Sequence, residues 1–178
     1  MQPTHAFIDE SKNRDYLLIT TLMIHSDLLA TRKKLRSLLL PGQERFHMKN
    51  ERDSRRKKLL SLIRDLNATV VIYRAPTSSH RRSQIEARAD VLQAFLDDAL
   101  NTSIRNVCLE SDETMNARDR QVIAQFLQRH QAVDGIRYQH LPAKSEILLC
   151  IPDAVGWAWN RGGEWKKMVA PLVDEQVV

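Results

Sequence analysis

The chain has 178 residues, of which 43% are hydrophobic, 28% are charged and only 5 are Gly, a composition that excludes a fibre or a wholly disordered protein. Its length predicts a single domain, 1–178, with any disorder at its ends. The formal net charge of +5 is concentrated in clusters at 32–36, 52–58 and 81–82, which suit a polyanion such as nucleic acid or, equally well, describe solvated helix faces.

Several chemistries lack their usual sequence signals. No run approaches the roughly 20 apolar residues that span a bilayer and no secretory leader is recognisable, so we expect a cytoplasmic protein without membrane contact. Cys108 and Cys150 stand far apart in apolar segments, which predicts buried, reduced thiols. The 6 His show no close pairing of zinc ligands, and neither a phosphate-binding Gly-rich loop nor a nucleophile elbow occurs. Zinc enzymes, nucleotide kinases and α/β-hydrolases therefore lose support.

The chain opens with two strand patterns followed by a basic helix. His5–Glu10 and Tyr16–Ile24 are rich in β-forming residues and flank a short polar segment, which predicts an antiparallel hairpin. Ser26 or Asp27 is placed to cap a basic amphipathic helix, and Pro41 with the following Gly is expected to end it.

Strand and helix patterns alternate through the rest of the chain. Ser83 and Glu86 form a capping box ahead of a long helix whose apolar side is expected to include Ile85. In chain order we predict a helix over 51–66, a strand over 68–74, a helix over 83–100, a strand over 104–110, a helix from 112 or 114 to 131, a strand over 135–141 and a last helix over 153–160. This order predicts an α/β fold, a mixed sheet that opens with a hairpin and carries helices on both faces.

Acidic residues end two of the predicted strands and interrupt the last apolar run. Asp9 ends the first strand, Glu110 and Asp112 follow the strand before the 112–131 helix, and Asp153 stands within an otherwise apolar segment. Each has a simple alternative role as a turn or helix cap. Taken together they are candidates for a site that binds a hard cation, because Mg²⁺ prefers oxygen ligands and close carboxylates repel one another unless a cation neutralises them.

Three short motifs resemble the bacterial DUF-3800 family, uncharacterised proteins that are assigned a ribonuclease H-like fold. Phe7–Ser11 is similar to that family's first strand ending in Asp-Glu-Ser, Phe46–Lys49 to its mid-chain His segment, and Leu148–Trp159 to its C-terminal Ala-Asp run. The chain departs from the pattern at Lys12, where Gly commonly follows, and at Pro152, where Ala usually precedes the final Asp.

The resemblance implies a ribonuclease H-type carboxylate set that is both catalytic and metal-binding: Asp9, Glu110 and Asp153, with Mg²⁺ or Mn²⁺ as the cofactor. Further contacts, either behind these ligands or with phosphate, are expected from the neighbouring polar residues Glu10, His47, Lys49, Asp112 and Lys144. In nucleases of this fold, metal ions activate water and stabilise the leaving oxygen.

These features support more than one function. The leading hypothesis is a metal-dependent nuclease that hydrolyses phosphodiester bonds in nucleic acid, with DNA and RNA both open. The alternative is a non-catalytic nucleic-acid or protein-binding module of the same fold, and a third candidate is an enzyme that acts on a different phosphoester. The sequence leaves the oligomeric state and the biological pathway open.

Overall fold

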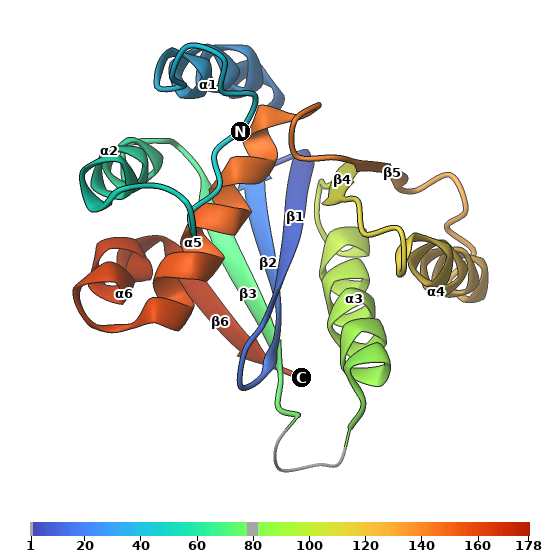
Figure 1. Cartoon of the computed structure of the whole chain (residues 1–178). Coiled ribbons are helices and arrows are strands. Elements are labelled where there is room, and N and C mark those ends of the chain that lie inside the picture. The colour runs from blue at the N-terminus through green and yellow to red at the C-terminus, as the bar shows by residue number, and fades with distance from the viewer. Residues whose placement is uncertain (1, 78–81) are drawn as a thin grey trace.

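A mixed sheet of six strands forms the centre of the fold (Figure 1). The computed structural model describes residues 2–77 and 82–178, so Arg81 of the third basic cluster lies outside the described residues. The strands are β1 (His5–Lys12), β2 (Tyr16–Met23), β3 (Thr69–Ala75), β4 (Asn106–Glu110), β5 (Arg137–Leu141) and β6 (Val173–Val177). Their order across the sheet is β5-β4-β1-β2-β3-β6.

The sheet combines antiparallel and parallel neighbours, as predicted. β1 and β2 form the expected hairpin, with His5 opposite Met23 and Lys12 opposite Tyr16. β4 lies parallel to β1 on its other side, β5 lies parallel to β4, and β6 lies parallel to β3 at the far edge. Since β1 and β4 are parallel neighbours, their carboxyl ends meet at the same edge of the sheet.

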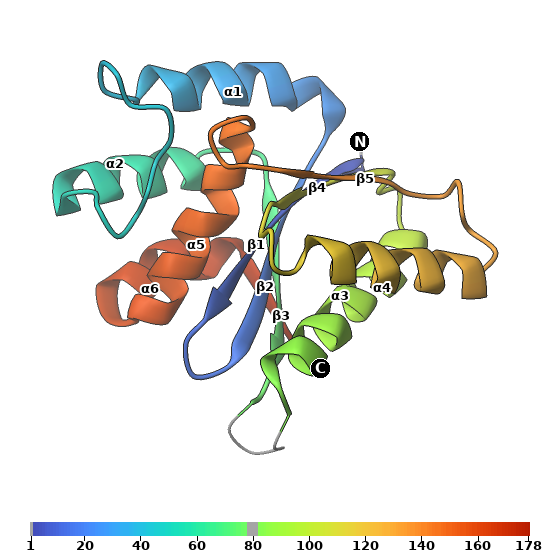
Figure 2. The same cartoon turned by 45° about the vertical axis from the view of Figure 1, so that its right-hand side comes forward.

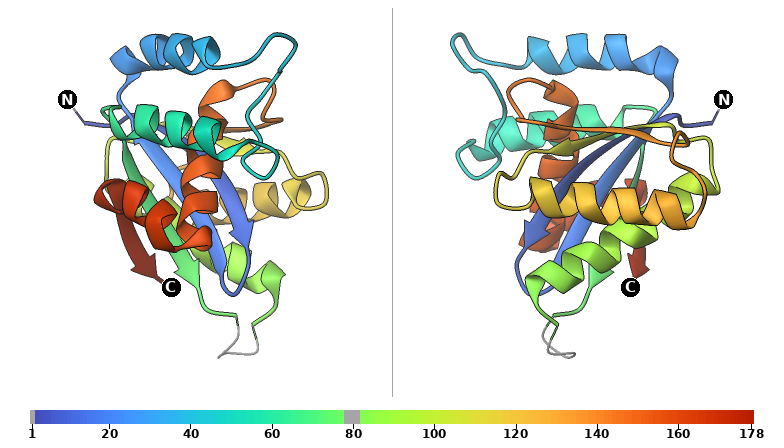
Figure 3. Two further views of the ribbon diagram at one scale, coloured as in Figure 1. Left: turned by 60° about the vertical axis from the view of Figure 1, so that its left-hand side comes forward. Right: turned by 90° about the vertical axis from the view of Figure 1, so that its right-hand side faces the viewer.

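Helices cover both faces of the sheet, which confirms that prediction (Figure 2, Figure 3). One face carries α1 (Leu28–Ser37), α2 (Asp53–Arg64), α5 (Cys150–Arg161) and α6 (Gly163–Val169); the other carries α3 (Gln84–Leu100) and α4 (Asn116–Arg129). The sheet separates two hydrophobic cores, because alternate side chains along each strand, β1 among them, point to opposite faces of the sheet. Phe7 joins the core beneath α5, whereas Ala6 and Ile8 join the core beneath α3.

Helix α5 packs closely against the hairpin. A Cβ atom added at Gly156 would lie 2.9 Å from Cδ1 of Ile19 on β2, so only glycine permits this approach without a shift. Near the end of the helix, Asn160 Nδ2 donates a 2.6 Å hydrogen bond to Ser11 Oγ on β1. These two contacts fix α5, and with it Asp153, relative to the carboxyl end of β1.

The early helices differ in detail from the predictions. Asp27 makes no side-chain capping bond, and α1 ends at Ser37, before Pro41 is reached. The capping box of Ser83 and Glu86 is confirmed at the start of α3. Ile85, however, is 47% exposed rather than on the buried side of α3. Arg88 is buried there instead, because a carboxylate on α4 neutralises it, as described below.

The C-terminal third holds the largest corrections. Helix α5 begins at Cys150, ahead of the predicted start at 153, and continues the 3₁₀ turn η2 (Ile147–Leu149). Pro152 is tolerated because it lies in the first turn of α5, where backbone N–H groups lack partners within the helix. Helix α6 and strand β6 were not predicted. The C-terminal end, one of the two places to which any disorder was expected to be confined, pairs with β3 as an edge strand.

Two further sequence predictions concern the cysteines and membrane contact. Cys108 and Cys150 are free and buried, as expected. Within residues 2–77 and 82–178, no helix has the length and apolar character needed to cross a membrane. The cytoplasmic location expected from the sequence stays a prediction.

Candidate functional site

Three carboxylates from distant parts of the chain line one pocket. Asp9 lies on β1, Glu110 is the last residue of β4, and Asp153 lies in the first turn of α5. All three line a pocket of about 190 Å³. The structure therefore brings together the carboxylate set that the DUF-3800 resemblance implies.

The strand pattern explains this convergence. Asp9 shares the α5 face of β1 with Phe7, and Glu110 shares the same face of β4 with Cys108. Ile8 pairs with Leu109 in the parallel register, so Asp9 and Glu110 are the next residues along two adjacent strands. Helix α5 then brings Asp153 over them through its close contact with β2.

The carboxylates lie close enough to perturb one another. Burial raises the pKa of Asp9 well above its ordinary value, and the charges of Glu110 and Asp153 and a hydrogen bond with Glu110 raise it further. Burial also raises the pKa of Glu110, as does the charge of Asp153. In Asp153 burial again raises the pKa, although hydrogen bonding to the Met48 backbone partly opposes it. Negative charge at this site is therefore only partly compensated by the protein.

The donor set fits a hard divalent cation in its chemistry. Mg²⁺ and Mn²⁺ take carboxylate oxygens, and Mg²⁺ keeps several waters, so that one or two carboxylates with substrate oxygens are sufficient. As the side chains stand, no three His, Cys, Asp or Glu residues in the described ranges are grouped so that they could hold a metal ion together. The site is thus a carboxylate-lined pocket rather than a closed cage of ligands.

A cationic segment, Arg45–Lys49, faces the carboxylates. Phe46 and Met48 are buried in the core, at 3% and 0% exposure. The alternate residues Arg45, His47 and Lys49 lie near the pocket, and their charges lower the pKa of Asp153. Arg45 Nη1 lies 3.5 Å from Glu110 Oε1. The lining of the pocket therefore combines carboxylates with cationic side chains, which suits a metal cation and a phosphate bound together.

Within this segment, His47 has a buried atom without a hydrogen-bond partner. Its Nδ1 makes no hydrogen bond to any group in the described part of the chain. His47 also lines both the carboxylate pocket and a neighbouring pocket of about 330 Å³. Because an unpartnered buried nitrogen is costly, this atom is suited to a water molecule or a ligand.

The neighbouring pocket extends the site along α5. Asp9, His47 and Asp153 are common to both pockets, while Lys49 and Trp157 line only the larger one. The guanidinium of Arg56 lies 4.6 Å from the ring centroid of Trp157, so one side of the indole ring is covered by a cation.

The remaining sequence candidates differ in where they lie. Glu10 lines the larger pocket and pairs with Lys12, 2.6 Å from Glu10 Oε1 to Lys12 Nζ. Asp112 accepts hydrogen bonds from Thr114, 3.0 Å from the backbone N and 2.6 Å from Oγ1, so it closes the turn before α4 and lines neither pocket. Lys144 is exposed and also lines neither pocket. Asp112 therefore stabilises the turn before α4 rather than capping the helix itself, since the N-cap residue of α4 is Met115 and makes no side-chain capping bond.

A buried ionic network that the sequence analysis did not predict lies beside the site. Arg88 is 4% exposed and donates to both carboxylate oxygens of Asp119, at 2.6 Å from Nε and 2.7 Å from Nη2. It also donates to Tyr16 and contacts Glu10, while His140 Nε2 lies 3.1 Å from Asp119. The signal was present, since Arg88 and Asp119 each occur at helical spacing within the buried side of their helix.

Arg45 was missed for a different reason. The segment around it forms no helix or strand, so no periodic pattern marked it. The only available signal was the alternation of the basic residues Arg45, His47 and Lys49 with Phe46 and Met48, which are buried.

Comparison with known proteins identifies the fold. No protein-family model matches the chain, and no curated protein matches it either. A chain in the structure of the PCNA:RNase HII complex from Archaeoglobus fulgidus is similar, with a TM-score of 0.58 and 14% identity over 95% of this chain and 76% of that one. Bst-RNase HIII in complex with Mn²⁺ gives a TM-score of 0.49 and 9% identity, and the match covers 96% of this chain but 62% of the RNase HIII chain. The fold is ribonuclease H-like.

Proposed function

We propose that the chain is a metal-dependent phosphodiester hydrolase that acts on nucleic acid. The observation that carries the proposal is the meeting of Asp9, Glu110 and Asp153, from three separate segments, at one pocket that Arg45 and His47 also line. The ribonuclease H-like fold supports the same chemistry. Membership of the DUF-3800 family is proposed on the motifs alone.

In this proposal Asp9, Glu110 and Asp153 hold Mg²⁺ or Mn²⁺. When bound, the cation supplies activation of water and stabilisation of negative charge on the phosphate and the leaving oxygen. Its charge also removes the repulsion that raises the pKa values of Asp9 and Glu110.

The cationic segment binds the phosphate in this proposal. Arg45 offers a fork of N–H donors, and its ion pair with Glu110 is long enough, at 3.5 Å, to be exchanged for a phosphate oxygen. Lys49 adds a flexible ammonium at the entrance of the larger pocket. His47, with its unpartnered Nδ1, positions water or donates to the phosphate.

The basic helices supply the long-range attraction for nucleic acid. Lys33, Lys34 and Arg36 extend along α1, and Lys57 and Lys58 along α2, on the same face of the sheet as the carboxylates. Positive charge of this kind attracts the phosphate backbone without reading its sequence. We therefore expect the binding of nucleic acid to weaken steeply as salt concentration rises.

The test is a calorimetric titration with Mn²⁺, followed by incubation with single-stranded and double-stranded DNA and RNA. Asp9→Asn and Asp153→Asn should abolish both metal binding and cleavage. Asp174→Asn, an exposed carboxylate on β6 at the far edge of the sheet, is the matched control and should behave as wild type. Cleavage that persists in a chelator would contradict the proposal.

One observation favours the second candidate, a nucleic-acid-binding module without catalysis. The carboxylates in the described part of the chain are not already grouped as a set of metal ligands. This candidate predicts salt-sensitive binding of nucleic acid that Asp9→Asn leaves unchanged, and no uptake of Mn²⁺ by the wild type even with nucleic acid present.

A further inference from the structure

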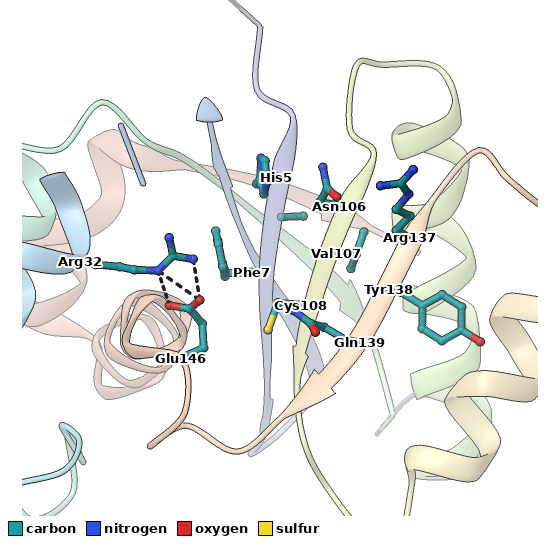
Figure 4. Close-up of a pocket in the computed structure, with 11 residues that line it drawn as sticks. His5, Phe7, Arg32, Asn106, Val107, Cys108, Arg137, Tyr138, Gln139 and Glu146 are labelled. Carbon is teal, nitrogen blue, oxygen red and sulfur yellow. Dashed lines mark hydrogen bonds and ion pairs between the residues drawn. The ribbon is translucent and has the colours of Figure 1, made fainter. Parts of the chain in front are cut away.

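A third pocket lies on the same face of the sheet, away from the carboxylates (Figure 4). Its volume is about 350 Å³, within the range of pockets that bind small molecules. Residues from the amino-terminal halves of β1 and β4 and from β5 form its floor, and Arg32 of α1 and Glu146, just before η2, form one wall.

The strand register arranges the floor in two rows. His5, Asn106 and Arg137 are register partners across β1, β4 and β5. One step further along the same face, Phe7, Cys108 and Gln139 form the second row. The first row is polar throughout, and the second combines two apolar side chains with an amide. The floor therefore offers hydrogen-bonding groups beside an apolar patch.

Most of the polar groups in this pocket are free to bind a ligand. Arg32 and Glu146 are paired, with Nε 3.0 Å and 3.2 Å and Nη2 2.6 Å from Glu146 oxygens, and no other side-chain hydrogen bond joins the eleven residues drawn (Figure 4). The side chains of Asn106, Arg137 and Gln139 make none with the other residues of the pocket. Arg137 and Gln139 are also exposed, so both are accessible from solvent.

The charge and chemistry of the pocket narrow the class of ligand. Glu146 is balanced by Arg32, which leaves Arg137 as the uncompensated charge and favours an anion. Asn106 and Gln139 each present a donor and an acceptor, the combination that side-chain amides use to bind the edges of nucleobases. Phe7 and Cys108 line the apolar end of the floor but are buried, at 3% and 5% exposure, so the contacts available to a ligand are mainly the polar ones.

We propose that this pocket binds a nucleotide, with its phosphate at Arg137 and its base at Asn106 and Gln139. The site is separate from the metal site of the proposed function. Along β1, Asp9 is four residues beyond His5, which corresponds to about 13 Å of strand. The segment between β5 and α5 touches both pockets, since Ala143 lines the carboxylate pocket and Glu146 lines this one. The nucleotide is either free or one unit of a nucleic-acid strand.

The experiment is a titration in the presence of a chelator, so that it does not depend on metal or on cleavage. The probes are the four nucleoside 5′-monophosphates and, separately, hexamers of the same nucleotides, with affinity measured by calorimetry and the side-chain amide signals of Asn106 and Gln139 followed by NMR. Arg137→Ala and Gln139→Ala should weaken binding about tenfold each, the effect of losing one charge-assisted or bidentate contact. Both residues are exposed on an edge strand, so folding should be retained.

Two matched controls separate this inference from the proposed function. Arg129→Ala removes an exposed arginine on the opposite face and should leave the affinity unchanged. Asp9→Asn should also leave it unchanged, whatever that variant does to metal binding. Binding of monophosphates supports a free nucleotide, and binding of hexamers alone supports a unit of a strand. No binding of either, or binding that Arg137→Ala and Gln139→Ala do not weaken, overturns the inference.

Discussion

Asp9 of β1 and Glu110 of β4 lie side by side on neighbouring parallel strands, one residue beyond the register pair of Ile8 and Leu109. Burial raises the pKa of both carboxyl groups, and the charge of Glu110 raises the pKa of Asp9 further. In the absence of a cation the pair therefore resists carrying two negative charges. A divalent cation bound there would let both groups ionise, which would couple metal binding to proton release.

The first prediction follows from the cost of this pair. Burial and, to a smaller extent, the charges of Glu110 and Asp153 raise the pKa of Asp9. Asp9 therefore lowers the free energy of unfolding at neutral pH. Without metal, Asp9→Asn should therefore be more stable than wild type by about 1 kcal/mol or more, a rise in Tm of about 2–4 °C. The asparagine oxygen can still accept the 2.7 Å hydrogen bond from the Glu10 backbone N.

The pH dependence of this stability difference tests whether the ionisation of Asp9 is its cause. Because the folded-state pKa of Asp9 is raised, its destabilising effect is lost as pH falls through that value, and it is absent once the unfolded chain is protonated, below about pH 3.9. Melting curves of wild type and Asp9→Asn should therefore converge at low pH. Added Mn²⁺ should stabilise wild type and not the variant. A variant that is less stable than wild type at pH 7 would contradict this account.

The second prediction concerns the contact that positions Asp153. In Gly156→Ala the new Cβ would lie 2.9 Å from Cδ1 of Ile19, so α5 or Ile19 must move. We expect a loss of about 1–3 kcal/mol, measured by denaturant unfolding, and weaker binding of Mn²⁺ because Asp153 moves with the helix. Adding Ile19→Val removes the atom that clashes and should restore part of both losses. Equal losses in the single and double variants would show that this contact is not the cause.

How far the sequence could predict these features depends on the length of the pattern involved. The hairpin and α3 follow long patterns, so their predicted bounds fall close to the observed ones, and the short strand β4 was identified by its run of consecutive apolar residues. Asp9 and Glu110 were identified because each follows an apolar run, although β1 continues beyond Asp9 to Lys12 whereas β4 ends at Glu110. Strand β6 could not be identified, since Asp174, Glu175 and Gln176 follow one another without alternation and its pairing with β3 depends on the tertiary fold.

The buried ionic network of Arg88 and Asp119 could not be predicted for a different reason. Arg88 and Asp119 fit the buried side of their helices by spacing, yet a charged residue is normally assigned to the solvent side. Only the packing of α3 against α4 shows that each is the partner of the other. Helical spacing alone therefore could not have shown that Arg88, and not Ile85, lies on the buried side of α3.

The third prediction tests that network. Arg88→Met should cost about 3–5 kcal/mol, because it leaves Asp119 buried without its cation. Burial tends to raise the pKa of Asp119, but hydrogen bonds from Arg88 and His140 outweigh it, and the pKa lies below its ordinary value. The stabilisation from Asp119 is therefore complete above the unfolded-state pKa, about 3.9, and is lost as pH falls towards the folded-state value.

The matched control for this network is the double variant Arg88→Met with Asp119→Leu, in which no charge is left unpaired. It should be more stable than Arg88→Met alone, and its stability should depend less on pH below about pH 4 than that of wild type. Denaturant unfolding across this pH range measures both effects. If the double variant is no more stable than the single one, the packing of the long side chains matters more than their charges.

The fourth prediction distinguishes the role of the cationic segment, Arg45–Lys49, from that of the carboxylates. Lys49 is exposed, lines the larger pocket, and its charge lowers the pKa of Asp153. Lys49→Ala should weaken binding of nucleic acid and reduce the slope of log affinity against log salt concentration by about one phosphate contact. The same change should strengthen binding of Mn²⁺, because a positive charge that competes with the metal is removed. A variant that was merely misfolded would lose both kinds of binding.

Lys144→Ala, which removes an exposed lysine that lines neither pocket, is the matched control and should change neither measurement. If Lys49→Ala leaves nucleic-acid binding and its salt dependence unchanged, the cationic segment does not bind phosphate.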